Sequence, residues 1–143
     1  MSELARMVDV HYSGVNSADL DKALSVFDED CEIVTPNGTV RGIRAQRALA
    51  EAFAVAAPDN RLTAVRTVEA GDTIVVEGVY SGTHTGPLAG PAGTVPATGK
   101  TFSFPYCDIF QARDGKFVSH HVYWDNATFL AQLGILPVEG ASV

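Results

Sequence analysis

The feature that most constrains this chain is a change of hydrophobic periodicity between its first and second halves. In the first third, apolar residues recur every three or four positions, which is typical of helices that bury one face. Beyond residue 60 the pattern changes to runs of alternating residues separated by turn signals, which is typical of strands. Helices followed by antiparallel strands predict an α+β fold, in which the helices cover one face of a curved sheet.

Three helices are expected in the first part of the chain. The first presents a stripe of five side chains: Leu4, Val8, His11, Tyr12 and Val15. A second helix is expected to begin at Asn16 or Ser17, because either side chain can cap free backbone N–H groups. The Ala-rich segment 43–56 predicts the third helix, which follows a short strand over 31–35.

Four long strands are expected in the second half. Their predicted ranges are 61–69, 73–84, 101–112 and 116–124. Asp114-Gly115 predicts a hairpin turn between the last two strands, and a short helix over 126–133 ends the pattern at Gly134. Segment 85–99 holds four Gly and three Pro, and it is either a plain connection or a loop over the mouth of a pocket.

Length and charge narrow the class of protein. The 143 residues predict one domain over 1–143, with enough chain to bury a core. The net charge of −7, without a basic cluster, argues against nucleic acid and anionic membranes as partners. The N-terminus lacks the pattern of a signal peptide, so we expect a cytoplasmic protein in which Cys31 and Cys107 stay reduced.

Short motifs in one fixed order carry a family resemblance. They are Pro58-Asp59, Ala70–Asp72, Gly82–Leu88, Pro96–Lys100, Asp114–Phe117, Asp125 and Gln132–Gly134. In this order the chain resembles the SnoaL-like polyketide cyclases. Two departures are the apparent extra segment Pro91–Thr94, and Ser119 and His121, where the family often has an acidic residue and a tryptophan.

The resemblance implies a cystatin-like, nuclear transport factor 2-like fold. In that fold a cone-shaped, curved antiparallel sheet and N-terminal helices enclose an apolar pocket. Ketosteroid isomerase and limonene-epoxide hydrolase share it, so the fold alone does not fix the reaction. The resemblance also implies a homodimer formed through the outer face of the sheet.

Asp125 is the first catalytic candidate. Alternation along the last strand places it on one face with Ser119, His121 and Tyr123, and the resemblance turns that face towards the pocket. There Asp125 matches the acid/base aspartate of the family, whose pKa an apolar pocket would raise. The alternative is a helix cap, because Asp125 immediately precedes the last helix.

The histidines are open to two interpretations each. His84 either hydrogen-bonds a substrate oxygen in the pocket, as the resemblance implies, or pins the Gly-rich loop. His121 either orients a ligand or belongs to a buried polar network. His120 lies on the opposite face from His121 and is expected to reach solvent or a neighbouring subunit, so the pair cannot chelate one metal ion.

A second carboxylate candidate lies on the preceding strand. Asp108 shares a face with Tyr106, and a carboxylate among aromatic rings invites a raised pKa; the alternative is a solvent-facing residue. Tyr12, Phe53 and Tyr80 complete the expected substrate contacts.

The leading hypothesis is therefore a cofactor-free and metal-free cyclase acting on an aromatic or polyketide-like carbonyl substrate. A base would remove a proton beside the carbonyl, and the enolate would close a ring by aldol addition. One alternative is an isomerase or an epoxide hydrolase; the hydrolases use an arginine between two carboxylates, and the pattern places none beside Asp108 and Asp125. The other alternative is a non-catalytic, dimeric module that binds an apolar ligand.

Overall fold

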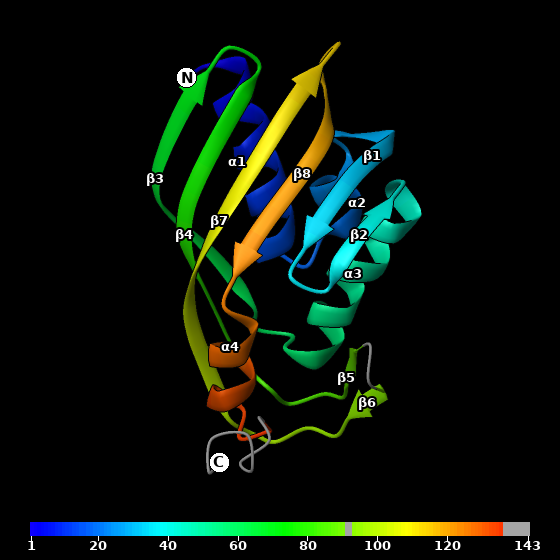
Figure 1. The fold of residues 1–143 in the computed structure, drawn as a ribbon, viewed down its shortest axis with the longest axis vertical. Helices are drawn as coiled ribbons and strands as arrows, with labels where there is room; N and C mark the ends of the chain where they lie inside the picture. Colours follow the sequence, from blue (N-terminus) through cyan, green and yellow to red (C-terminus); the bar gives the residue numbers. More distant parts are fainter. Residues whose placement is uncertain (91–92, 136–143) are drawn as a thin grey trace.

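The structure is a computed structural model that describes residues 1–90 and 93–135 (Figure 1). A twisted sheet forms one layer, and the N-terminal helices pack across one of its faces (Figure 1). The helices are α1 (Glu3–Asn16), α2 (Leu20–Leu24), α3 (Ile43–Ala56) and α4 (Asn126–Gln132). Among the described residues, no helix is long and apolar enough to cross a membrane.

The N-terminal helices follow the predicted periodicity, with one correction. Ser2 caps α1, and Gly14 lets α2 approach, because a Cβ there would lie 2.4 Å from the Ala23 nitrogen. The cap of α2 is Asp19 rather than Asn16 or Ser17. Asn16 is still helical, and its amide instead pairs with the Leu62 backbone at 2.7 and 2.9 Å, which ties α1 to the sheet.

Six strands form the main sheet, in the order β2-β1-β8-β7-β4-β3. They are β1 (Phe27–Thr35), β2 (Gly38–Arg41), β3 (Arg61–Ala70), β4 (Thr73–Thr83), β7 (Thr101–Arg113) and β8 (Lys116–Trp124). The pairing is antiparallel as expected, except that β1 runs parallel to β8. The sheet is therefore mixed, and the α+β class and the curved-sheet architecture are confirmed.

The inner face of the sheet carries the apolar core. Every second side chain of the long strands points to this face and is buried. Examples are Ile74 and Val76 on β4 and Phe102, Phe104 and Phe110 on β7. These pack against Met7 and Val8 of α1, together with other helix residues, in one core cluster. Removing this apolar surface from water is what holds the helices on the sheet.

The Gly-rich segment after β4 forms a small ribbon of its own. Strands β5 (Leu88–Gly90) and β6 (Gly93–Val95) pair with each other, and the backbone N–H groups of Thr85 and Gly86 donate to the Ala56 carbonyl at the end of α3. Of the apparent extra segment, Pro91 and Ala92 lie outside the described residues.

Candidate active site

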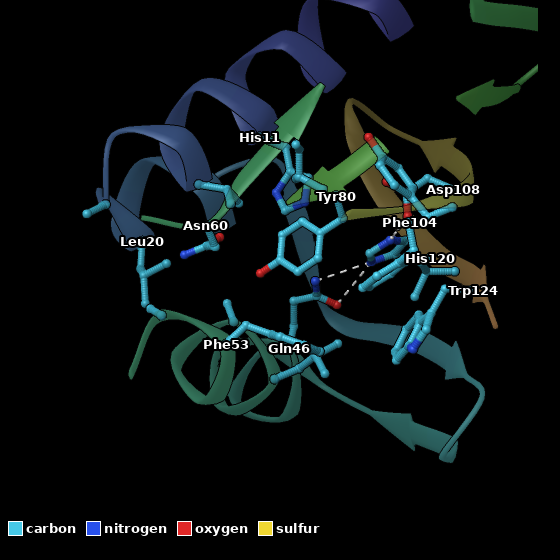
Figure 2. A pocket seen from close by; sticks show the side chains of 18 of the residues that line it. His11, Leu20, Gln46, Phe53, Asn60, Tyr80, Phe104, Asp108, His120 and Trp124 are labelled. Atoms are coloured by element: carbon cyan, nitrogen blue, oxygen red, sulfur yellow. Dashed lines mark hydrogen bonds and ion pairs between the residues drawn. The ribbon is translucent and has the colours of Figure 1, made fainter. Parts of the chain in front are cut away.

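A cavity of about 210 Å³ lies between the helices and the inner face of the sheet (Figure 2). Its wall is mostly apolar and includes Leu49, Phe53, Phe104, Val122 and Trp124. No residue from the described part of segment 85–99 lines it, which favours the plain connection for the residues described there. The polar side chains that line the cavity are few, and they come from the inner face of the sheet, from the helices and from Asn60 between α3 and β3.

The most distinctive polar feature is a buried carboxylate–imidazole pair. Asp108 of β7 and His120 of β8 lie on neighbouring antiparallel strands, and Oδ1 of Asp108 is 2.8 Å from Nε2 of His120. Only 3% and 5% of the two residues is exposed, and both line the cavity. In so dry an environment a charge–dipole or ion-pair contact is far stronger than at the surface.

The second oxygen of Asp108 is held by two tyrosines in series. The Tyr12 hydroxyl donates to Oδ2 of Asp108 at 2.6 Å, and the Tyr106 hydroxyl donates to the Tyr12 oxygen at 2.9 Å. Burial, reinforced by the nearby Asp108 charge, raises the pKa of the Tyr12 hydroxyl, and burial also raises the pKa of Tyr106. Both phenols therefore remain hydrogen-bond donors, and both hydroxyl protons in this series of hydrogen bonds point towards Asp108.

These contacts fix the imidazole of His120. Because a carboxylate only accepts hydrogen bonds, the proton that faces Asp108 is carried by Nε2 of His120. The other nitrogen, Nδ1, faces the Gln46 amide of α3, with Nε2 of Gln46 at 3.2 Å and Oε1 at 3.4 Å (Figure 2). One amide can thus donate to a neutral Nδ1 or accept from a protonated one.

A second histidine, His11, stays neutral beside this pair. His11 is buried, its Nδ1 lies 2.7 Å from the Ala23 carbonyl, and its ring centroid is 6.0 Å from that of His120. Burial, together with the neighbouring His120, lowers the pKa of His11 to about 4. His11 therefore acts as an uncharged wall of the cavity near pH 7.

Gly78 of β4 makes room for the tyrosine chain. It pairs with Tyr106 across the strands, and a Cβ at this position would lie 2.4 Å from the Tyr106 hydroxyl and 2.6 Å from the Thr63 carbonyl. A side chain at Gly78 would therefore displace the phenol from Tyr12.

The expected position of Asp125 is wrong. Its side chain is exposed and caps α4, with Oδ1 accepting from the Thr128 N–H at 3.2 Å and Oδ2 from the Thr128 hydroxyl at 2.9 Å. These bonds lower the pKa of Asp125, which is the opposite of the shift expected for a base in an apolar pocket. The helix-cap alternative therefore describes this residue.

The faces assigned to the last strand are also wrong beyond Phe117. Phe117 pairs with Ala112 and Ser119 with Gln111, so Val118 is an extra residue, a β-bulge. The bulge reverses the alternation after Phe117. His120 consequently faces the cavity instead of solvent, and His121 lies on the outer face.

The two outward residues of β8 form a separate contact. His121 lies 3.0 Å from Glu32 of β1, and the Tyr123 hydroxyl is 3.4 Å from Nδ1 of His121. Neither His121 nor Tyr123 lines the inner cavity, and Tyr123 is 49% exposed. The structure therefore does not bring His121 or Tyr123 to the cavity, where their ligand contacts were expected.

His84 is buried but does not line the cavity. Its Nδ1 accepts from the Thr98 N–H at 3.2 Å and lies 2.9 Å from the Thr98 hydroxyl. Among the described residues its Nε2 has no hydrogen-bond partner. This geometry corresponds to the structural alternative, in which His84 pins the segment after β4.

Four of the other residues expected to contact a substrate lie at the cavity, although contact with a substrate stays a prediction. Tyr106, Asp108, Tyr80 and Phe53 line the cavity, and Tyr12 reaches Asp108 from behind it. Sequence reasoning missed Gln46 and the inward position of His120. One signal was available, because Val122 and Trp124 make the His120 face of β8 more apolar than the His121 face.

Within residues 1–90 and 93–135, no group of three or more His, Cys, Asp or Glu side chains is arranged to hold a metal ion.

Comparison with known proteins gives one family and one fold. The family model described as SnoaL-like polyketide cyclase matches residues 5–133. No curated protein sequence matches the chain.

Solved structures agree with this match. The structure of TsrD from Streptomyces laurentii is 28% identical, with a TM-score of 0.81 over 94% of this chain and 96% of that one. IdmH from Streptomyces antibioticus, described as a proposed polyketide cyclase, is 28% identical, with a TM-score of 0.76 over 91% and 97%. A Catenulispora acidiphila protein with a ketosteroid isomerase-like fold, 21% identical, has a TM-score of 0.75 over 93% and 95%.

Proposed function

Because the chain belongs to the SnoaL-like polyketide cyclase family, we propose that it is a cofactor-free enzyme that moves a proton on a small carbonyl compound bound in the cavity. The observation that carries this proposal is the buried Asp108–His120 pair, which opens onto a mostly apolar cavity. The reaction would be ring closure of an aldol type on an aromatic or polyketide-like substrate. Asp108 is the second carboxylate candidate of the sequence analysis, whereas His120 replaces Asp125 as the proposed base.

His120 is the proposed base. Asp108 holds the Nε2 proton, so the lone pair of the imidazole lies on Nδ1, where the contact with Gln46 is long. A substrate C–H beside a carbonyl can displace that amide and give its proton to Nδ1. The resulting imidazolium is stabilised by the Asp108 carboxylate, which is the role of the aspartate in a catalytic triad.

The same pair can return the proton. After the enolate carbon attacks a second carbonyl, the new alkoxide takes the proton from Nδ1, and His120 is neutral again. The two tyrosines donate along a series of hydrogen bonds that ends at Oδ2 of Asp108, and such bonds stabilise a carboxylate. One such acid/base group contributes about 10²–10⁴-fold in rate.

The experiment uses 2-tetralone, a bicyclic ketone with acidic protons beside its carbonyl. Exchange of these protons in D₂O, followed by proton NMR, reports proton abstraction without the need for the natural substrate. Asp108→Asn is expected to lower the enzyme-catalysed exchange rate by about 10²-fold or more, because His120 loses its charge partner. Binding of 2-naphthol, which mimics the enol, should change by only about twofold to threefold, since the apolar contacts remain.

Asp125→Asn is the matched control. Asn caps helices about as well as Asp, so this variant should fold normally and keep the wild-type exchange rate. Loss of exchange in Asp125→Asn with retention in Asp108→Asn would contradict the proposal and restore the interpretation drawn from the sequence. Wild-type exchange no faster than buffer would contradict it as well.

The two alternatives have less support. Epoxide hydrolysis by a carboxylate–arginine–carboxylate set needs an arginine in the site, and none of the described residues that line the cavity is an arginine. A purely ligand-binding module would be favoured by a cavity without an inward carboxylate, but Asp108 lies in its wall. Proton transfer therefore accounts for the polar residues that line the cavity better than either alternative does.

The homodimer stays a prediction, as do the cytoplasmic location and the absence of nucleic-acid and membrane partners. The outer face of the sheet supports the dimer, because Val68 and Tyr123 are exposed around a shallow groove that Val75 and Pro105 also line. Covering such apolar side chains would stabilise an interface between two copies. Sedimentation of the wild type and of Val68→Lys tests this, with a shift to monomer expected in the variant.

A further inference from the structure

Tyr80 differs from Tyr12 and Tyr106 in the hydrogen bonding of its hydroxyl group. The hydroxyls of Tyr12 and Tyr106 are hydrogen-bonded, whereas that of Tyr80 has no partner among the described residues. The Tyr80 hydroxyl is also not fully enclosed by protein. Among the described residues, the only fully enclosed side-chain nitrogen or oxygen without a hydrogen-bond partner is Nε2 of His84. Since Tyr80 itself lines the cavity and is only 8% exposed, its hydroxyl opens onto that space.

The ring of Tyr80 is held in a fixed direction. Phe53 meets it edge-on at 5.5 Å, and Phe102 and Phe104 pack at 5.6 and 5.8 Å between ring centroids. Figure 2 shows the hydroxyl directed away from Asp108, towards the side of the cavity where Asn60 lies. Burial, followed by the charge of Asp59, raises the pKa of Tyr80, so the hydroxyl stays protonated and can donate.

Asn60 supplies the complementary acceptor. Its Nδ2 donates to the Ala57 carbonyl at 2.9 Å, which fixes the amide and leaves Oδ1 without a hydrogen bond to the described residues. Asn60 lines the same cavity as Tyr80. A donor together with an acceptor matches a hydroxyl group, which can accept from Tyr80 and donate to Asn60, whereas a ketone or ether oxygen can only accept.

These two residues lie at the other end of the site from the proton-transferring pair. Tyr80 pairs with Phe104 in the sheet, and Asp108 lies four residues further along β7. Four residues of strand span about 13 Å between Cα atoms. One small rigid molecule in a cavity of about 210 Å³ therefore has polar contacts available at both ends and apolar walls between them.

We propose that Tyr80 and Asn60 bind a hydroxyl group of the substrate, so that the substrate class is a mono- or bicyclic hydroxylated ketone with its two oxygens at opposite ends. This inference rests on the proposed function, because the ketone end is the one that faces Asp108 and His120. The cavity volume of about 210 Å³ limits the substrate to one or two rings.

Three naphthalene probes test the hydroxyl contact. They are 2-naphthol, 2,6-dihydroxynaphthalene and 6-methoxy-2-naphthol, with affinities measured by calorimetry. The wild type should bind the dihydroxy compound roughly tenfold more tightly than 2-naphthol, which is the gain expected of one or two buried hydrogen bonds. The methoxy compound should show no such gain, because it cannot donate to Asn60.

Tyr80→Phe keeps the ring packing and removes only the hydroxyl. In this variant the preference for the dihydroxy compound should fall to within about twofold of unity, because its donor is gone. Tyr123→Phe on the outer face is the matched control and should keep the wild-type preference. For exchange of 6-hydroxy-2-tetralone, Tyr80→Phe should raise KM and leave kcat unchanged, which a purely structural role would not produce.

The inference is overturned if the wild type does not prefer the dihydroxy compound, if it prefers the methoxy compound equally, or if Tyr80→Phe keeps the preference. The proposed function is judged separately, by the effect of Asp108→Asn on 2-tetralone exchange. Normal dependence on Asp108 without hydroxyl preference would refute this inference alone. Hydroxyl preference without dependence on Asp108 would refute the proton-transfer function alone.

Discussion

His120 and His121 are neighbours in the chain, and each pairs with a carboxylate on an opposite face of the sheet. The inner pair, His120 with Asp108, is separated by 2.8 Å, and the outer pair, His121 with Glu32, by 3.0 Å. Their side chains differ mainly in burial: 6% and 4% exposed for the inner pair, against 32% and 37% for the outer pair. The two pairs have nearly the same residue types and distances, but they differ in their exposure to solvent.

The difference shows that burial, not residue type, makes one pair a candidate site. Water and salt screen the outer pair, so its contribution to stability and its influence on a bound molecule are small. The inner pair is shielded, and its remaining hydrogen-bonding positions are filled by Tyr12 and Gln46. Four predictions test this contrast between the faces.

The largest expected effect is on proton exchange. His120→Gln should lower the rate of 2-tetralone exchange by about 10²–10⁴-fold, because an amide cannot take up the proton. His121→Gln should leave the rate within about twofold, since His121 faces away from the cavity. Proton NMR in D₂O measures both variants, and equal losses in the two would remove the distinction between the faces.

The second prediction concerns stability. Asp108→Ala should lower the free energy of unfolding by about 3–5 kcal/mol, because Tyr12 and His120 would lose a buried partner. Glu32→Ala should cost about 1 kcal/mol or less, as exposed pairs do. Urea denaturation at pH 7 measures both, and a larger loss for Glu32→Ala would refute the argument from burial.

The third prediction concerns pH and the buried His11. Its pKa of about 4 in the folded state lies below the unfolded value of 6.5, so the unfolded chain binds more protons between these two values. The contribution of neutral His11 to the free energy of unfolding is complete above pH 6.5 and is lost as the pH falls towards 4. It amounts to about 2 kcal/mol between pH 7 and pH 5.

His11→Asn should therefore show a smaller loss of stability between pH 7 and pH 5 than the wild type, by about 2 kcal/mol. His121→Gln is the control and should keep the wild-type dependence on pH more closely. The check is urea denaturation at both pH values, and an unchanged slope in His11→Asn would show that another group causes the dependence.

The fourth prediction concerns Gly78. Gly78→Ala should cost about 1–3 kcal/mol, because its Cβ overlaps the Tyr106 hydroxyl and the Thr63 carbonyl. Ser81→Ala, on the outer face of the same strand, should have little effect on thermal unfolding. A Gly78→Ala protein as stable as Ser81→Ala would show that the tyrosine chain can shift without cost.

Much of the fold could be predicted because it depends on local pattern. The helix over Ile43–Ala56 and the strand over Lys116–Trp124 have the predicted bounds, since helical and alternating periodicity are properties of neighbouring residues. The parallel pairing of β1 with β8 could not be read in this way. It joins segments about ninety residues apart, and strand periodicity does not specify the partner.

The candidate site was predicted only in part, for a related reason. Asp108 was placed correctly because β7 alternates regularly along its inner face. His120 was misplaced because one unpaired residue, Val118, shifts the register by one, and a shift of one residue exchanges the two faces of a strand. Asp125 lies just beyond that strand, where helix capping, not strand alternation, orients its side chain.

The sequence by itself determined which segments become helix or strand and which residue types are available for proton transfer. It did so because backbone preferences and hydrophobic periodicity act over a few residues. Only the tertiary structure decided which of two adjacent histidines faces the cavity and which carboxylate it meets. That choice depends on strand register and on burial, which arise when distant segments pack together and exclude water.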